Sequence, residues 1–335
     1  MRIAIDVMAS DHGPAVITRG ALQALASLPD SLSLTLIGSR DDIESTAGEF
    51  TDLDGRFDIV ETSQVIGAKE HPVEALKAKP ESSLVKAVEL VQKREADALV
   101  SAGSTGAQVA ASTLMLRHLP GVKRAGIATI LPSKKGNVAI IDVGANVNCK
   151  AVHLYQYAMM CSLYAQTVLD IASPRVGLVS VGEEKSKGSL LVKEVNSQLE
   201  KSDLHFVGNI EGHEVFESKA DVVVCEGFMG NVILKISEGL VEAMFSLLGE
   251  AAHKGGMTED SGFRKIMGSL KQKFDWKEIG GAQLLGVNGV SIIAHGRSNE
   301  EAIASAVRSA HKLIEVDLNG SIVSALEQTP AKVTD

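Results

Sequence analysis

The chain has 335 residues, of which 45% are hydrophobic and only 4% aromatic, so it can build one large aliphatic core or two smaller ones. Its 42 acidic and 33 basic residues leave a net charge of −9, which argues against a general nucleic-acid binder because such a protein needs a basic surface. Three cysteines without a Cys-x-x-Cys pair, no signal-peptide pattern and no long uncharged apolar run predict a soluble cytoplasmic protein without disulfides, a metal site, a cofactor or a membrane-spanning helix.

Apolar segments and helical periodicities alternate along most of the chain. The apolar runs are mostly continuous, which is typical of strands covered on both faces. The predicted strands are residues 2–7, 32–37, 57–61, 97–101, 125–130, 137–142, 175–181, 204–207, 221–225 and 290–294. The predicted helices are residues 15–28, 40–47, 82–95, 106–117, 151–170, 188–200, 231–253, 262–274 and 299–326. This alternation predicts an α/β fold with right-handed crossovers and a mostly parallel sheet.

Five of the predicted strands run into loops rich in Gly, Ser, Asn, Asp or Thr, and a helix follows each loop. The loops are residues 9–14, 101–106, 142–146, 182–188 and 226–231. The carboxyl ends of parallel strands lie along one edge of a sheet, where open α/β folds bind ligands. Because glycine-rich turns expose backbone N–H groups and a helix N-terminus adds positive potential, we expect this edge to hold a phosphate-sized anion.

The loop after the first strand contains a histidine between candidate binding residues. His12 can act as a general acid or base or as a phosphate ligand, and Asp11 and Gly13 flank it. In the alternative interpretation, Asp11 caps the next helix and Pro14 takes its first position. That alternative leaves His12 without a role.

The 101–106 loop combines two glycines with three hydroxyl side chains between a strand and a helix. A helix cap alone explains one hydroxyl and one glycine, so the density of both favours an anion site. The candidate binding residues are Ser101, Gly103, Ser104, Thr105 and Gly106. The spacing matches neither G-x-x-x-x-G-K-[ST] nor G-x-G-x-x-G, so the sequence predicts neither a nucleotide P-loop nor a standard dinucleotide site.

The three later loops carry further candidates. Asn146, close to Asp142 and Gly144, can stabilise an oxyanion with its amide or a backbone N–H, although Asn is also common in turns. Lys187 can neutralise phosphate, or belong to a solvated charged loop. Asn231 either binds substrate or caps the next helix.

Residues 235–275 break the alternation, because two helical stretches follow one another without a strand between them. The second stretch places five apolar side chains on one face and four cations on the others. The apolar residues are Phe263, Ile266, Met267, Leu270 and Phe274, and the cations are Arg264, Lys265, Lys271 and Lys273. We predict a helical hairpin that projects from the sheet.

Taken together, the loops resemble those of the bacterial phosphate acyltransferases. The matching segments are Asp6 with 11–13, 101–103 with 105–107, 142–146, 173–177, 187–188, 208–209, 220–224, 227–228 with 230–231, 280–282 with 285–286, and 294–296. The match runs nearly end to end, which favours a single domain over residues 1–335. The chain departs from the family's pattern at Ala9 and Ser10, where two glycines are usual, and at Ser104, where Asn is usual.

The resemblance implies a Rossmann-like α/β/α sandwich and a homodimer that is cytoplasmic and peripherally associated with the inner face of the membrane. It implies transfer of a long-chain acyl group from acyl-acyl carrier protein to inorganic phosphate, and a second acyltransferase that passes the acyl group to glycerol 3-phosphate. Such a transfer needs mainly positioning and oxyanion stabilisation. We therefore expect the 101–107 loop and Lys187 to hold phosphate, and His12 and Asn146 to lie near the reacting carbonyl.

The predicted hairpin has three possible contacts. Arg264, Lys265, Lys271 and Lys273 are candidates for receiving the acidic carrier protein. With Phe263 and Ile266 the same helix can lie on anionic lipid, or it can pack against a second subunit.

Three other functions compete with this prediction. A phosphotransacylase acting on short acyl-coenzyme A shares the phosphate chemistry but binds a nucleotide carrier. A nicotinamide-dependent dehydrogenase fits the fold class but not the absent glycine fingerprint. A non-catalytic membrane adaptor would bind lipid or partners and form no product.

Overall fold

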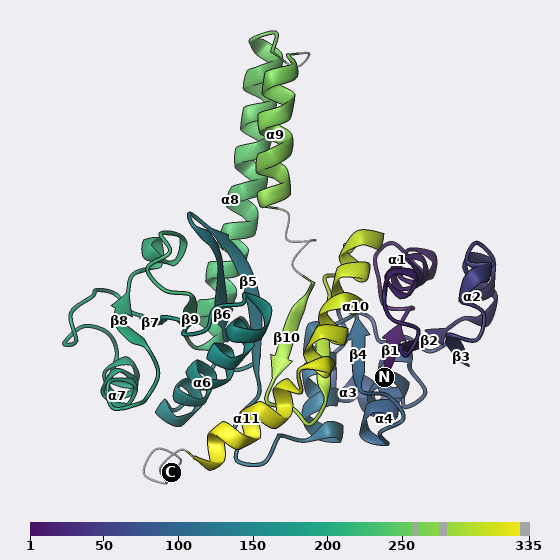
Figure 1. Cartoon of the computed structure of the whole chain (residues 1–335), viewed down its shortest axis with the longest axis horizontal. Coiled ribbons are helices and arrows are strands. Elements are labelled where there is room, and N and C mark those ends of the chain that lie inside the picture. Colours follow the sequence, from purple (N-terminus) through teal and green to yellow (C-terminus); the bar gives the residue numbers. More distant parts are fainter. Residues whose placement is uncertain (258–259, 275–279, 329–335) are drawn as a thin grey trace.

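The computed structural model describes residues 1–257, 260–274 and 280–328. Within these residues the chain forms one eleven-stranded sheet with helices on both faces (Figure 1). The strand order is β3-β2-β1-β4-β11-β10-β5-β6-β9-β7-β8. This is the predicted α/β sandwich with a mostly parallel sheet.

The ten predicted strands are all present, and a short further strand, β10, was not predicted. The strands are β1 Arg2–Asp6, β2 Ser33–Gly38, β3 Phe57–Glu61, β4 Ala98–Ser101, β5 Gly126–Ser133, β6 Gly136–Ile141, β7 Val176–Val179, β8 Phe206–Ile210, β9 Val222–Val224, β10 Ala282–Leu285 and β11 Val290–Ile293.

The nine predicted helices are also present, with two differences, and the short helix α3 is present in addition to them. The helices are α1 Pro14–Ser27, α2 Arg40–Ala47, α3 Pro72–Ala78, α4 Ser83–Gln92, α5 Thr105–Ala111, α6 Ala151–Val168, α7 Leu190–Leu199, α8 Gly227–Lys254, α9 Ser261–Lys273, α10 Glu300–Glu315 and α11 Leu318–Glu327. The helix predicted over 299–326 is two helices, because Asp317 adopts φ +47° and its carboxylate accepts from the Gly320 N–H to start α11. The predicted helix 106–117 is α5 followed by a π-helical turn, Ser112–Leu116.

The sheet consists of two blocks of parallel strands that run in opposite directions. β10 pairs antiparallel with both β11 and β5, and β5 pairs antiparallel with β6. Because of these three reversals, β6, β9, β7 and β8 run in the direction opposite to β1, β4 and β11. The expectation that all five loops lie along one edge is therefore wrong. The loops after β1 and β4 leave one edge, and the loops after β6, β9 and β7 leave the opposite edge.

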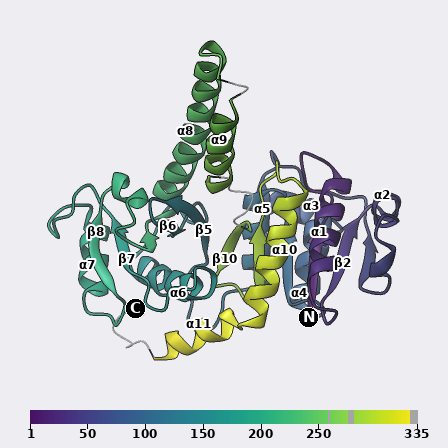
Figure 2. The same cartoon turned by 45° about the horizontal axis from the view of Figure 1, so that its top comes forward.

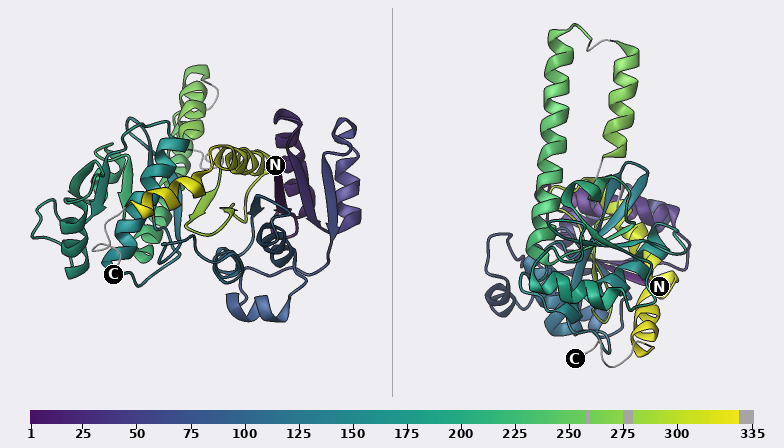
Figure 3. Two further views of the ribbon diagram at one scale, coloured as in Figure 1. Left: turned by 60° about the horizontal axis from the view of Figure 1, so that its bottom comes forward. Right: turned by 90° about the vertical axis from the view of Figure 1, so that its left-hand side faces the viewer.

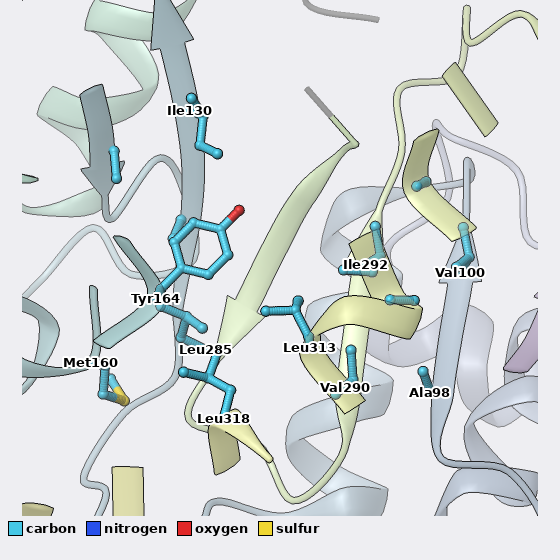
Figure 4. Close-up of a cluster of buried hydrophobic side chains, with 14 of the residues drawn as sticks. Ala98, Val100, Ile130, Met160, Tyr164, Leu285, Val290, Ile292, Leu313 and Leu318 are labelled. Carbon is cyan, nitrogen blue, oxygen red and sulfur yellow. The ribbon is translucent and has the colours of Figure 1, made fainter. Parts of the chain in front are cut away.

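One hydrophobic cluster joins the two blocks (Figure 4). Tyr164 of α6 and Leu313 of α10 cover the sheet centre together with Leu318 of α11. Leu285 of β10 and Ile292 of β11 belong to the same cluster. α10 and α11 thus cross the middle of the molecule and hold together the wing with α1 and α2 and the wing with α6 and α7 (Figure 2).

α8 and α9 project side by side from the body of the molecule (Figures 1 and 3). This agrees with the predicted hairpin over its described residues; residues 258–259 and residue 275, where the prediction ends, lie outside them. Within the described ranges, neither α8 nor any other helix has the length and apolar character needed to cross a bilayer.

Candidate functional site

Loops from the two opposite edges of the sheet come close together around Thr105, the first residue of α5. Thr105 lines two neighbouring cavities, of about 180 Å³ and about 360 Å³. The smaller, which we call the first cavity, also touches Asn231 of α8 and His295 after β11. The larger, the second cavity, lies between α5 and the loop after β6, where Asn146 contributes to its wall. The structure therefore brings predicted residues from both edges to one place.

In the loop after β4, Ser101 points inward. Its hydroxyl donates to the Asp6 carboxylate at 2.8 Å and accepts from the Gly103 N–H at 3.2 Å. Both Ser101 and Asp6 are buried, and burial raises the pKa of Asp6. Ser101 thus holds the loop in shape from its buried side. The exposed residues at the tip of the loop are Thr105 and Gly106.

The two departures from the family's pattern have local explanations. The Ser104 hydroxyl accepts from the Ala107 N–H at 3.3 Å, so Ser104 is the N-cap of α5. Ala9 packs closely on the loop, because a Cβ placed on Gly103 would lie 2.7 Å from the Ala9 Cβ. Gly103 is therefore needed for close approach between the loops after β1 and β4.

In the loop after β6, Asp142 organises the backbone. Its fully buried carboxylate accepts from the N–H groups of Gly144, Ala145 and Asn146 at 2.8–3.0 Å, and from that of Ile127 at 3.1 Å. Burial raises the pKa of Asp142, and these N–H groups oppose that effect. Asp142 therefore sets the loop's shape from its inner side.

The Asn146 amide is already engaged within the protein. Its Nδ2 donates to the carbonyl of Ala125 at 2.6 Å and to the Tyr157 hydroxyl at 2.8 Å. Asn146 thus links its loop to Ala125, just before β5, and to α6, and these bonds use the hydrogens of its amide within the protein. We therefore treat Asn146 as a positioning residue.

Asn231, unlike Asn146, lies at an exposed position. The cap of α8 is Glu226, whose carboxylate accepts from the N–H groups of Phe228 and Met229 at 2.8 and 3.0 Å. Asn231 lies one turn further on, exposed in the first cavity and close to Gly144, where an added Cβ would sit 3.8 Å from the Asn231 Cβ. Asn231 therefore lines the first cavity and does not act as the cap of α8.

The four predicted residues of the loops after β1 and β7 lie at exposed or half-buried positions outside the two cavities' walls. They are Asp11, His12, Gly13 and Lys187. The Asp11 N–H donates to the Gly296 carbonyl at 2.9 Å, which joins the loop after β1 to the loop after β11. Gly13 adopts φ +81° just before Pro14 of α1, so glycine suits that position.

The structure adds three residues that the sequence analysis left unassigned. Lys235 and Glu238 of α8 form a 2.7 Å ion pair in the wall of the first cavity, which His295 also lines. His295 Nδ1 accepts from the Arg297 N–H at 3.1 Å, and burial, then the nearby Lys235 charge, lower its pKa. Positions 231, 235 and 238 share one helical face, and this spacing could have identified the two α8 residues.

The comparisons with known proteins agree on the family. The sequence model of a family described as fatty acid synthesis protein matches residues 1–320. A phosphate acyltransferase from Desulforamulus reducens is 45% identical over 331 residues, covering 98% of each chain. Another from Heliobacterium modesticaldum is 43% identical over 336 residues, covering 99% of each. The chain belongs to the phosphate acyltransferase family.

Solved structures share the fold of this phosphate acyltransferase family member at low sequence identity. A phosphotransacetylase from Streptococcus pyogenes has a TM-score of 0.61 at 18% identity, covering 94% of each chain. EutD phosphotransacetylase from Staphylococcus aureus has a TM-score of 0.59 at 16% identity, also covering 94% of each. These likenesses support the α/β architecture described above.

Proposed function

We propose that the chain transfers a long-chain fatty acyl group from the thioester of an acyl carrier protein to inorganic phosphate. Family membership supports acyl transfer to phosphate. The observation that carries the proposal is the meeting of two loop edges at Thr105, where hydroxyl and amide groups face a pair of cavities. Two cavities joined at one polar point suit a reaction in which an anion and a thioester must be held together.

The reaction needs no covalent intermediate on the protein. An oxygen of monohydrogen phosphate attacks the thioester carbonyl carbon and forms the new C–O bond, giving a tetrahedral oxyanion. The C–S bond then breaks, and the departing thiolate takes the proton that the phosphate carried. Acyl phosphate and free thiol result, with the charge of −2 unchanged. The protein's task is to align the two reactants and to stabilise the oxyanion.

We assign the roles as follows. Thr105 and Lys187 hold phosphate, from the two opposed edges, and His12 contributes from the loop after β1. Lys187 follows β7, in the same parallel block as β6 and β9, so its loop leaves the edge that also carries Asn231. Asn231 donates to the oxyanion, and Asn146 and Asp142 hold the neighbouring loop in shape.

The test is acyl phosphate formation from long-chain acyl carrier protein and phosphate, with the product trapped by hydroxylamine. Lys187→Ala and Asn231→Ala should each lower kcat/KM by about 100-fold, as expected for loss of one electrostatic contact in a transition state. Lys185→Ala is the matched control, because Lys185 lies in the same exposed loop but pairs with Glu200. Full activity in both site variants would remove these assignments. A wild type that forms product only from short acyl-coenzyme A would make the chain a phosphotransacylase instead.

The hairpin is a contact surface in this proposal. Ile236, Leu240 and Met244 lie four residues apart on α8 and are 63%, 58% and 52% exposed. An apolar stripe of this kind suits a second subunit, so we propose a homodimer in which the hairpin packs against its counterpart. On α9 the cations Arg264, Lys265, Lys271 and Lys273 remain exposed beside Ile266, which supports peripheral contact with anionic lipid on the cytoplasmic face.

A further inference from the structure

The chain's charges are distributed very unevenly along the sequence. Residues 98–169 contain a single acidic residue, Asp142, which is fully buried. The same stretch contains six basic residues: Arg117, Lys123, Arg124, Lys134, Lys135 and Lys150. In a chain with a net charge of −9, this segment is an isolated region of positive charge.

One of these cations, Arg124, lines the second cavity beside His118. Arg117 and Lys123 are exposed in the same connection between the π-helical turn and β5. Lys150 is exposed at the start of α6. We call Arg117, Lys123, Arg124 and Lys150 the basic face. Within the described residues none of the four forms an ion pair with a carboxylate.

The basic face is spatially continuous. The Lys123 N–H donates to Gln156 Oε1 of α6 at 2.8 Å, and Gln156 Nε2 donates to the Gly121 carbonyl at 2.9 Å, so the loop is held on α6. His153 lies between the two parts: after burial, the charges of Arg124 and Lys150 are the causes that lower its pKa. The charges of Arg124 and Lys150 are therefore both close to His153.

The second cavity is suited to a thin, mostly uncharged ligand. Its wall includes Val73, Val109 and Leu114, and it contains no carboxylate side chain. Leu114 is 61% exposed, so apolar surface reaches the solvent beside the basic face. The same cavity touches Thr105 and Asn146, where the reaction is proposed to occur.

We propose that the basic face is the docking surface for the acyl carrier protein and that the second cavity takes its pantetheine arm. The thioester then lies at Thr105, and the phosphodiester of the arm pairs with Arg124, whose planar guanidinium suits such an anion. The inference rests on the proposed function and adds to it the location of the partner. An acidic partner is repelled by most of this acidic chain and attracted to the basic face.

The outer hairpin cations, Arg264 and Lys265, are a poorer location for the carrier. Lys254, at the outer end of α8, is 23 residues beyond Asn231, or about 35 Å along the helix axis. Figure 3 shows that α9 runs back from the outer end of the hairpin, and Arg264 and Lys265 lie near its start at Ser261. A carrier bound at these two residues would have to extend its arm along most of the hairpin to reach Thr105. Lys271 and Lys273 lie in the last turn of α9, so the test below treats them separately.

The test reverses two charges at a time and compares two thioester donors. The variant Lys123→Glu/Lys150→Glu should lower kcat/KM for long-chain acyl carrier protein at least tenfold. It should leave kcat/KM unchanged for the same acyl group on N-acetylcysteamine, which has no carrier and no charge. Lys193→Glu/Lys201→Glu on and after α7 changes the net charge equally and should alter neither value by more than twofold.

Several outcomes would overturn the docking surface. They are an unchanged rate with the carrier, an equal loss with both donors, or a loss that appears instead in Lys271→Glu/Lys273→Glu. Carrier binding, followed by fluorescence anisotropy of labelled holo-carrier, separates this proposal from the function. A wild type that acylates phosphate from the carrier thioester, with carrier binding that Lys123→Glu/Lys150→Glu leaves unchanged, overturns docking alone. A wild type that acylates phosphate from neither donor overturns both.

Discussion

At the scale of single residues, two buried aspartates give the site its shape. Asp6 ends β1 and supports the 101–106 loop through Ser101, while Asp142 follows β6 and collects the N–H groups of its own loop. The sequence singled out Ser101 and Asp142 because carboxylates and hydroxyls beside glycines often bind ligands. Residue type and spacing do not tell which way a side chain points, and here both point into the protein.

The raised pKa of Asp6 predicts a pH-dependent stability. Burial raises its folded pKa above the usual 3.8, so folding favours the protonated form. The contribution of Asp6 is present below pH 3.8 and is lost as pH rises through the folded pKa. In Asp6→Asn the amide can still accept from the Met8 N–H and donate to Ser101, but it does not titrate. The free energy of unfolding of the wild type, minus that of the variant, should fall by about 1.4 kcal/mol per pH unit between the two pKa values.

Urea unfolding of both proteins between pH 4 and pH 7 measures this difference, because titrations shared by the two proteins cancel. Asp170→Asn is the control. Its carboxylate is 82% exposed in a 3.5 Å pair with Lys312, so this variant removes one surface carboxylate and leaves the buried Asp6 site unchanged. A difference for Asp6→Asn that does not change with pH would show that this carboxyl group does not titrate differently in the folded protein.

At the scale of elements, α8 shows what the sequence could and could not predict. Its existence and its end were predicted well, but it begins at Gly227 instead of residue 231. Gly227 and Gly230 look like loop residues, since glycine is unfavourable inside a helix. They stand in the first turn because that turn lies directly on the loop after β6. A Cβ on Gly227 would come 2.6 Å from the Asn146 carbonyl oxygen, and one on Gly230 would overlap the carbonyl oxygen of Asp142.

Gly230→Ala should therefore separate α8 from the Asp142 loop. We expect a loss of about 2 kcal/mol in the free energy of unfolding and at least a tenfold loss of kcat/KM, since Asn231 would shift with the helix. Gly239→Ala in the same helix is the control: an added Cβ meets nothing within 4 Å, and the change should stabilise by up to about 1 kcal/mol. Denaturation and turnover are measured for both variants. If the two variants behave alike, the close contact does not matter.

At the scale of the whole molecule, the alternation of strands and helices predicted the α/β class but not the opposed blocks. One signal for the reversal was present in the sequence. The predicted strands 125–130 and 137–142 have no helix between them, and a parallel crossover needs a dozen or more residues. In the structure Ser133 of β5 pairs with Gly136 of β6 across a two-residue turn. β10 gave no comparable signal, because its four residues lie between glycines and are too few for a pattern to emerge.

The opposed blocks leave α8 pointing out of the junction, and its apolar stripe of Ile236, Leu240 and Met244 is exposed to solvent. We expect the wild type to be a dimer without lipid, and Ile236→Ser/Leu240→Ser/Met244→Ser to be a monomer with unchanged helix content, because exposed apolar stripes of this size are rare on monomers. Light scattering after gel filtration measures the mass. Gly239→Ser/Ser246→Ala, which leaves the stripe intact, should remain dimeric. Sedimentation with anionic vesicles distinguishes lipid contact from dimer contact. If the wild type is monomeric in solution and binds vesicles only while Phe263 and Ile266 are present, the hairpin contacts the membrane instead of a second subunit.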